Sequence, residues 1–172
     1  GWAAAWADYD NDGDLDLYVS NGGSAGAGDN VLFRNEEQGF VDATGPSGTG
    51  DGGNGTGAVF ADFDGDGDQD LLIAKGGFLP QGEANRLFLN RGDATFADVS
   101  EQAGLDEARS SYAAVVGDWD GDGLLDLYLT QFRTQFNRLY RNLGGGSFVD
   151  VTGPKEVRSS NFSSGAGGIF SD

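Results

Sequence analysis

The sequence predicts an all-β fold built from β-propeller blades, and three observations lead to this prediction. Thirty-one of the 172 residues are glycine, and each interior glycine costs a helix about 1 kcal/mol relative to alanine, which disfavours long helices. The chain repeats itself at a spacing of about 55 residues. Within each repeat, alternating apolar and polar residues indicate four short strands. Four short antiparallel strands per repeat are typical of propeller blades.

An aspartate-rich segment marks each repeat. It reads DYDNDGDLD at residues 8–16, DFDGDGDQD at 62–70 and DWDGDGLLD at 118–126. We therefore expect one propeller segment over residues 1–172, with blades at 1–54, 55–110 and 111–164. The approach to Asp172 matches the approach to Asp62, so residues 165–172 are expected to form the first strand of a fourth blade.

Each repeat should contain its strands in the same order. The first strand enters the aspartate segment and the second leaves it, whereas the third lies between two asparagines and the fourth carries a Phe-x-Asp motif. Small residues four positions before each aspartate segment suit a first strand crowded by its neighbours: Ala4, Ala58, Ala114 and Gly168. The expected strands are 3–7, 57–61 and 113–117 (first), 15–19, 71–74 and 125–130 (second), 30–35, 85–90 and 137–142 (third), and segments within 39–44, 95–100 and 147–152 (fourth).

The aspartate segments have the composition of cation-binding loops. Acidic side chains occupy positions 1, 3, 5 and 9, and glycine occupies position 6, where a loop that wraps an ion turns sharply. Position 7 varies, and its leucine in the third loop indicates a backbone carbonyl ligand. The expected ligands are the side chains of Asp8, Asp10, Asp12, Asp16, Asp62, Asp64, Asp66, Asp70, Asp118, Asp120, Asp122 and Asp126, with the position-7 residues Asp14, Asp68 and Leu124.

Four carboxylates, a carbonyl and water make an all-oxygen shell that suits Ca²⁺ better than the stricter octahedron of Mg²⁺. The alternative is a solvated acidic turn. However, 14 of the 28 acidic residues lie in these loops, and a turn without an ion gains nothing from their mutual repulsion. An EF-hand would need a glutamate at position 12, where this chain has Val19, Ile73 and Leu129. The sequence therefore predicts three Ca²⁺ sites.

Composition excludes several classes of function. The formal charge of −18 opposes binding to nucleic acid or anionic membranes, and no apolar run is long enough to insert into a membrane. The chain has no histidine and no cysteine, which removes imidazole bases, Ser-His-Asp triads, disulfides and cysteine-bound zinc. It also has no methionine, which favours a processed piece or an excerpt of a longer protein.

Weaker signals leave alternatives open. The aromatic at position 2 of each loop (Tyr9, Phe63, Trp119) could stack on sugars, but packing between blades is favoured. Trp2 and Trp6 are expected in the core, with Trp2 the more exposed candidate. The paired asparagines could be ligands, although turn capping is favoured. Four arginines at matched strand positions (Arg34, Arg86, Arg138, Arg141) form either an anion site or surface ion pairs, and ion pairs are favoured. Asn161-Phe162-Ser163 fits an N-glycosylation acceptor.

Taken together, the motifs resemble a known repeat. DxDxDGxxD before an apolar strand, followed by NxLxxN and GxFxDVT, resembles the FG-GAP/VCBS repeat of β-propellers. The run FADVSEQAGL at residues 96–105 further resembles the branch of cartilage acidic protein and ASPIC/UnbV proteins. The resemblance implies calcium loops between the first two strands of each blade, in adhesion and matrix proteins outside the cell. It also implies about seven blades, whereas this chain supplies three.

These observations predict a non-catalytic, calcium-stabilised propeller segment of an extracellular adhesion, matrix or surface protein. Its expected partner is a protein or glycan, and further blades or self-association are expected to close the arc. One alternative is a polysaccharide lyase or hydrolase on a propeller scaffold, whose base would be a tyrosine, a carboxylate, Lys75 or Lys155. Another is a subunit of an extracellular fibre.

Overall fold

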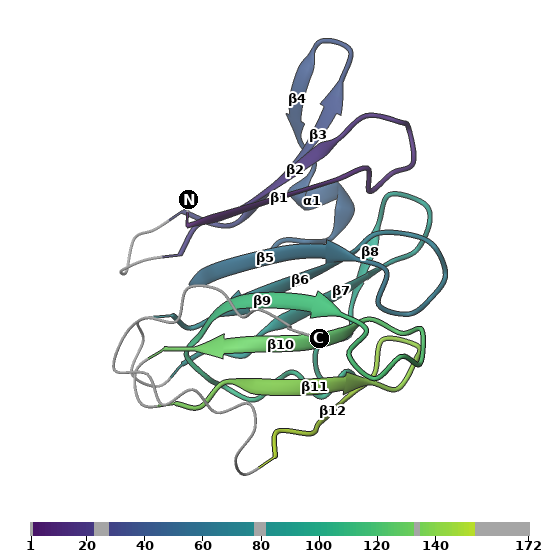
Figure 1. The fold of residues 1–172 in the computed structure, drawn as a ribbon. Coiled ribbons are helices and arrows are strands. Elements are labelled where there is room, and N and C mark those ends of the chain that lie inside the picture. Colours follow the sequence, from purple (N-terminus) through teal and green to yellow (C-terminus); the bar gives the residue numbers. More distant parts are fainter. Residues whose placement is uncertain (1, 23–27, 78–81, 133–134, 154–172) are drawn as a thin grey trace.

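The computed structural model describes residues 2–22, 28–77, 82–132 and 135–153, and it confirms the prediction of an all-β protein. Three four-stranded antiparallel sheets follow one another along the chain, each with its strands in sequence order, as expected for propeller blades (Figure 1). Their strands are β1 (Ala3–Ala7), β2 (Asp16–Ser20), β3 (Val31–Glu36) and β4 (Gly39–Asp42); β5 (Gly55–Ala61), β6 (Asp70–Lys75), β7 (Arg86–Asn90) and β8 (Phe96–Asp98); and β9 (Ser111–Gly117), β10 (Asp126–Gln131), β11 (Arg138–Asn142) and β12 (Phe148–Asp150).

The sheets lie face to face, with the first strand of each sheet beside the first strand of the next. β1 contacts β5, and β5 contacts β9. The approach is close at Gly57, where an added Cβ would lie 3.0 Å from the Tyr112 carbonyl oxygen and 3.1 Å from the Ala113 Cα. The first strands are therefore crowded, as predicted, but the position that excludes a side chain is Gly57 and not the neighbouring Ala58.

Two apolar layers, one at each junction between sheets, form the core. Strand β6 serves both, because successive side chains of a strand point to opposite faces. Leu71 and Ile73 pack towards the first sheet, and Leu72 and Ala74 towards the third. All six residues of β6 are buried. The middle sheet thus gains its stability from both neighbours, as the blades of a propeller do.

The first asparagine of each NxLxxN motif caps the end of the second strand, which confirms the turn-capping interpretation. The Asn30 side-chain oxygen accepts the Asn21 N–H at 2.7 Å. Asn85 does the same for Lys75 at 3.1 Å, and Asn137 for Gln131 at 2.8 Å. These three caps turn the chain from the second strand towards the third.

Two features differ from the sequence prediction. Trp6, expected in the core, is 54% exposed, because no sheet in the described part of the chain covers that face of β1; its ring contacts Phe40 at a centroid distance of 6.1 Å. A one-turn helix, α1 (Thr44–Ser47), follows β4 and was not predicted. The proposed fourth-blade strand at 165–172 and the Asn161 acceptor lie outside the described residues. No helix in the described ranges is long and apolar enough to cross a membrane.

Candidate metal centres

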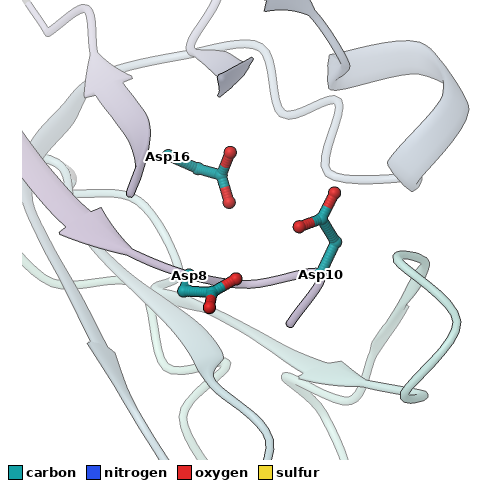
Figure 2. A group of neighbouring side chains, drawn as sticks. All are labelled: Asp8, Asp10 and Asp16. Atoms are coloured by element: carbon teal, nitrogen blue, oxygen red, sulfur yellow. The ribbon is translucent and has the colours of Figure 1, made fainter. Parts of the chain in front are cut away.

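The three aspartate loops connect β1 to β2, β5 to β6 and β9 to β10, and each brings three carboxylates together. Within each group, one oxygen from every side chain lies within 4.8 Å of the others. Figure 2 shows the first group, in which three carboxylates from the two ends of the loop face a common space. The groups are Asp8, Asp10 and Asp16; Asp62, Asp64 and Asp66; and Asp118, Asp120 and Asp122.

Position 6 shapes each loop as predicted. Gly13, Gly67 and Gly123 have φ values of 97°, 98° and 89°, in the left-handed region that favours glycine. Their N–H groups donate to the second carboxylate oxygen of position 1, at 3.0, 3.0 and 2.9 Å. The backbone therefore folds around the first aspartate and fixes its orientation.

Position 5 adds a smaller hydrogen-bonded turn to each loop. Its carboxylate accepts the backbone N–H of the residue at position 7, at 2.9 Å in all three loops. This bond turns the position-7 backbone regardless of the side chain, which explains why leucine is tolerated there. The carbonyl ligands predicted at Asp14, Asp68 and Leu124 remain predictions.

The aspartate at position 9 has a structural role that the motif did not reveal. Asp16, Asp70 and Asp126 are fully buried. In each, one oxygen accepts the N–H of the loop aromatic, and the other accepts the N–H of the second asparagine of the third strand, at 2.7–3.1 Å. Position 9 therefore ties the loop to its own sheet. It belongs to the carboxylate triad only in the first loop, where Asp16 takes the place that Asp66 and Asp122 hold in the others.

The first loop contains an unsatisfied buried oxygen that a cation would fit. Oδ1 of Asp10 is buried and has no hydrogen-bond partner among the described residues, and its side chain is only 10% exposed. Burying a carboxylate oxygen without a partner is costly. Burial raises the pKa of Asp10, Asp16 and Asp64, and it raises the pKa of Asp70 to about 7. A divalent ion would supply both the missing ligand contact and the missing positive charge.

The loop aromatics pack between blades, as favoured, at both junctions within the structure. Tyr9 is buried against Phe96 of the second sheet, with ring centroids 5.6 Å apart. Phe63 is buried against Phe148 of the third sheet at 5.8 Å. Trp119 lies in the β9–β10 loop of the last described sheet and is 47% exposed.

The four matched arginines form ion pairs, in agreement with the favoured interpretation. Arg86 lies 3.5 Å from Asp98, and Arg138 lies 2.8 Å from Asp150. The other two lie beside aspartate loops: Arg34 Nε is 3.9 Å from Asp10 Oδ2, and Arg141 Nε is 3.7 Å from Asp120 Oδ2. Sequence reasoning missed this proximity. The signal for it was that the first and third repeats have arginine at this position, whereas the second repeat has Leu89.

Comparison with known protein families agrees with this geometry. The family model described as the FG-GAP-like repeat matches residues 8–73 and 78–129, which include all three aspartate loops. No match was found among curated proteins. The matched segments cover most of the chain, and the repeated sheets and carboxylate triads agree with the match, so the chain belongs to the FG-GAP-like repeat family.

Proposed function

We propose that each aspartate loop binds one Ca²⁺ and that the three ions are structural. The observation that carries this proposal is the recurrence of a carboxylate triad at the equivalent turn of each of the three sheets. Asp10 adds a buried oxygen without a hydrogen-bond partner in the described part of the chain. The proposed ligands are the side chains at positions 1, 3, 5 and 9 and the carbonyl at position 7. All are oxygens, the donor type that Ca²⁺ prefers.

A bound ion would stabilise the turn between the first two strands of a blade. Carboxylates this close repel one another, and partial burial strengthens the repulsion. Because both strands bury side chains against the neighbouring sheet, a stabilised turn also stabilises the junction. This role requires no chemistry, so we propose a non-catalytic protein.

Three of the groups that the enzymatic alternative could use are buried in the described part of the chain. Lys75 is 3% exposed and its Nζ lies 2.8 Å from Asp51 Oδ1. Tyr9 and Tyr18 are buried, and burial raises the pKa of both hydroxyls, that of Tyr9 to about 12. A general base needs contact with substrate and a pKa near the working pH. Burial keeps these three side chains from contact with a substrate, which supports a binding role.

We further propose that the chain acts outside the cell, as part of an adhesion, matrix or surface protein related to the cartilage acidic protein branch. The predicted calcium loops and the strongly acidic composition support this setting, in which millimolar calcium would fill the sites. The proposed partner is a protein or a glycan, not a nucleic acid or a membrane interior. Further blades, or other copies of the chain, would cover the end faces. A glycan array probed in calcium and in chelator tests the partner.

Calorimetric titration of chelator-stripped protein tests the calcium proposal. We expect three ions per chain for the unaltered protein. Asp10→Asn, Asp64→Asn and Asp120→Asn should each lower the number to two, because each removes a position-3 carboxylate from one loop. Asp106→Asn, which alters an exposed aspartate outside the loops, is the matched control and should leave three. A stoichiometry near zero, or three ions bound to Asp120→Asn, would refute the proposal.

A further inference from the structure

The metal loops of neighbouring blades are joined by a short chain of buried hydrogen bonds. Asn90, the second asparagine of the second repeat, donates its side-chain amide to the Tyr9 carbonyl in the first loop at 2.7 Å. Its own N–H donates to Asp70 Oδ1 at 2.8 Å, at the end of the second loop. Asn90 is buried. One residue therefore contacts parts of two successive metal loops.

The same arrangement recurs at the next junction. Asn142 donates its side-chain amide to the Phe63 carbonyl in the second loop at 2.8 Å, and its N–H donates to Asp126 Oδ1 at 2.8 Å. Phe63 N–H in turn donates to Asp70 Oδ2 at 2.7 Å. A continuous path thus runs from the first loop through Asn90, Asp70, Phe63 and Asn142 to Asp126.

The place where each asparagine contacts the preceding loop is significant. Tyr9 and Phe63 stand at position 2, between the carboxylates of positions 1 and 3. Fixing the carbonyl of position 2 restricts the backbone on which both carboxylates are carried. Among the described residues a second link joins the loops at the first junction alone, where Asn11 Nδ2 donates to Asp68 Oδ1 at 2.8 Å. The corresponding residues at the next junction are Gly65 and Leu124, so the asparagine bond is the link that both junctions share.

We propose that Asn90 and Asn142 are positioning residues that hold the metal loop of the preceding blade and couple ion binding at adjacent loops. The inference rests on the proposed calcium sites. An ion in the second loop orders Asp70 and Phe63, and the Asp70 carboxylate holds the Asn90 backbone, whose side chain orders the first loop. By thermodynamic linkage the effect is reciprocal, so an ion in the first loop favours binding in the second. Burial strengthens each bond of the path.

Calcium titration followed by amide NMR tests this proposal loop by loop. The N–H groups of Gly13, Gly67 and Gly123 bond the first carboxylate of their own loops and report on each separately. Loss of one buried hydrogen bond costs about 1 kcal/mol, which corresponds to about a fivefold change in affinity. The side-chain amides of Asn90 and Asn142 each also donate to a carbonyl of their own loop, those of Gln69 at 3.2 Å and Leu125 at 3.0 Å. We therefore expect Asn90→Ala to weaken the Gly13 and Gly67 titrations by about this factor and more than the Gly123 titration. Asn142→Ala should weaken the Gly67 and Gly123 titrations more than the Gly13 titration.

The chain supplies a matched control. Asn35 holds the same motif position in the first repeat, and its N–H bonds Asp16 at 2.8 Å, but the described structure places no preceding loop against its side chain. Asn35→Ala should leave all three titrations unchanged. Uniform weakening of all three loops by Asn90→Ala would show general destabilisation and overturn the proposal, as would unchanged midpoints.

A second variant tests the coupling without touching the asparagines. Asp64→Asn impairs the second loop and leaves the path intact, so it should raise the calcium concentration at the Gly13 midpoint. An unchanged Gly13 midpoint in Asp64→Asn would contradict coupling, even if Asn90→Ala fails to fold. If none of the three glycine amides of the unaltered protein responds to calcium, the proposed calcium sites fail as well. The two failures are therefore distinguishable.

Discussion

The aspartates of each loop differ in how much of their hydrogen-bonding capacity the protein itself uses. Position 1 receives the N–H of the position-6 glycine, and position 9 receives one N–H on each oxygen. Asp10, at position 3 of the first loop, retains a free buried oxygen among the described residues. The backbone of the first loop therefore holds the carboxylates of Asp8 and Asp16 in place and leaves one oxygen of Asp10 available to a cation.

Calcium binding should release protons below neutral pH. Burial raises the pKa of Asp70 to about 7 from an ordinary value of 3.8, so at pH 6.0 this carboxyl is mostly protonated, whereas at pH 8.5 it is ionised. A nearby cation favours the ionised form. We therefore expect proton release on calcium binding at pH 6.0 and almost none at pH 8.5.

Calorimetry in two buffers with different ionisation enthalpies measures this release. Equal release at both pH values would contradict the assignment.

The same raised pKa has a consequence for the metal-free protein. The contribution of the Asp70 carboxyl to the free energy of unfolding is fully present below pH 4 and is lost as the pH rises through about 7.

At this scale the sequence was sufficient to predict the carboxylate positions but not their separate roles. The spacing of Asp8, Asp10 and Asp16 shows that they can meet. It does not show that Asp16 also bonds Asn35, because that contact depends on how β2 pairs with β3. Long-range pairing, absent from the motif, decides which oxygens remain free.

At the level of strands and connections, a buried ion pair holds the first two sheets together at a junction. Lys75, at the end of β6, lies 2.8 Å from Asp51 Oδ1 and 3.4 Å from Glu83 Oε2. Asn30, before β3, donates to the other Asp51 oxygen at 3.2 Å. The pair therefore links the second sheet to the segment that follows α1 and to the first sheet.

Lys75→Ala should destabilise the protein by up to about 3–5 kcal/mol, because it removes the nearer cation of buried Asp51 and leaves only Arg86, whose Nε lies 3.5 Å from Asp51 Oδ1 among the described residues. The control is Glu36→Ala, which removes an ion pair between Arg34 and Glu36 whose side chains are both substantially exposed. That change should cost less than about 1 kcal/mol. Urea unfolding in calcium measures both. Similar small effects for the two variants would show that the buried pair contributes little.

Strands were more predictable than the short helix. In β10 the buried Leu127 and Leu129 flank the less buried Tyr128, whereas β6 is apolar on both faces because it packs on both neighbouring sheets. Helix α1 reads Thr-Gly-Pro-Ser, a composition typical of a turn. It forms one helical turn through local bonds such as Ser47 N–H to the Ala43 carbonyl at 2.9 Å, and it has no periodic pattern long enough to predict.

At the scale of the whole molecule, the two end sheets carry complementary exposed groups. Trp119 lies in the β9–β10 loop of the third sheet, at the position where Tyr9 and Phe63 of the other two loops are buried by the next blade. Phe40 of the first sheet is half exposed. It holds the same repeat position as Phe96 and Phe148, which contact the rings of Tyr9 and Phe63. By analogy with the internal junctions, we propose that each end face packs against another blade of the same type.

We expect the isolated chain to associate in calcium through these faces. Sedimentation should show species larger than 17.9 kDa, and Trp119→Asp should shift them towards the monomer by placing a charge at the junction. Leu143→Asp is the control, because Leu143 is also exposed but its equivalents are Glu36 and Arg91, which are polar. A monodisperse monomer that binds no hydrophobic dye would contradict this expectation.

The repeat made the number and order of the described sheets predictable, because each unit encodes the same strands and turns. It did not predict the exposure of Trp6. Burial of a blade face depends on the neighbouring blade and not on the residue's own apolar character. The side chains at internal junctions were therefore interpreted correctly, and those on the end faces were not.

Thermal unfolding in calcium and in chelator tests most directly the central claim that bound ions stabilise the sheets. A ligand present at 100 times its dissociation constant adds about 2.7 kcal/mol per site, so calcium should raise the melting temperature by many degrees. Asp10→Asn, Asp64→Asn and Asp120→Asn should each lose part of the increase, and Asp106→Asn should keep all of it. A melting temperature that is the same in calcium and in chelator would contradict the claim.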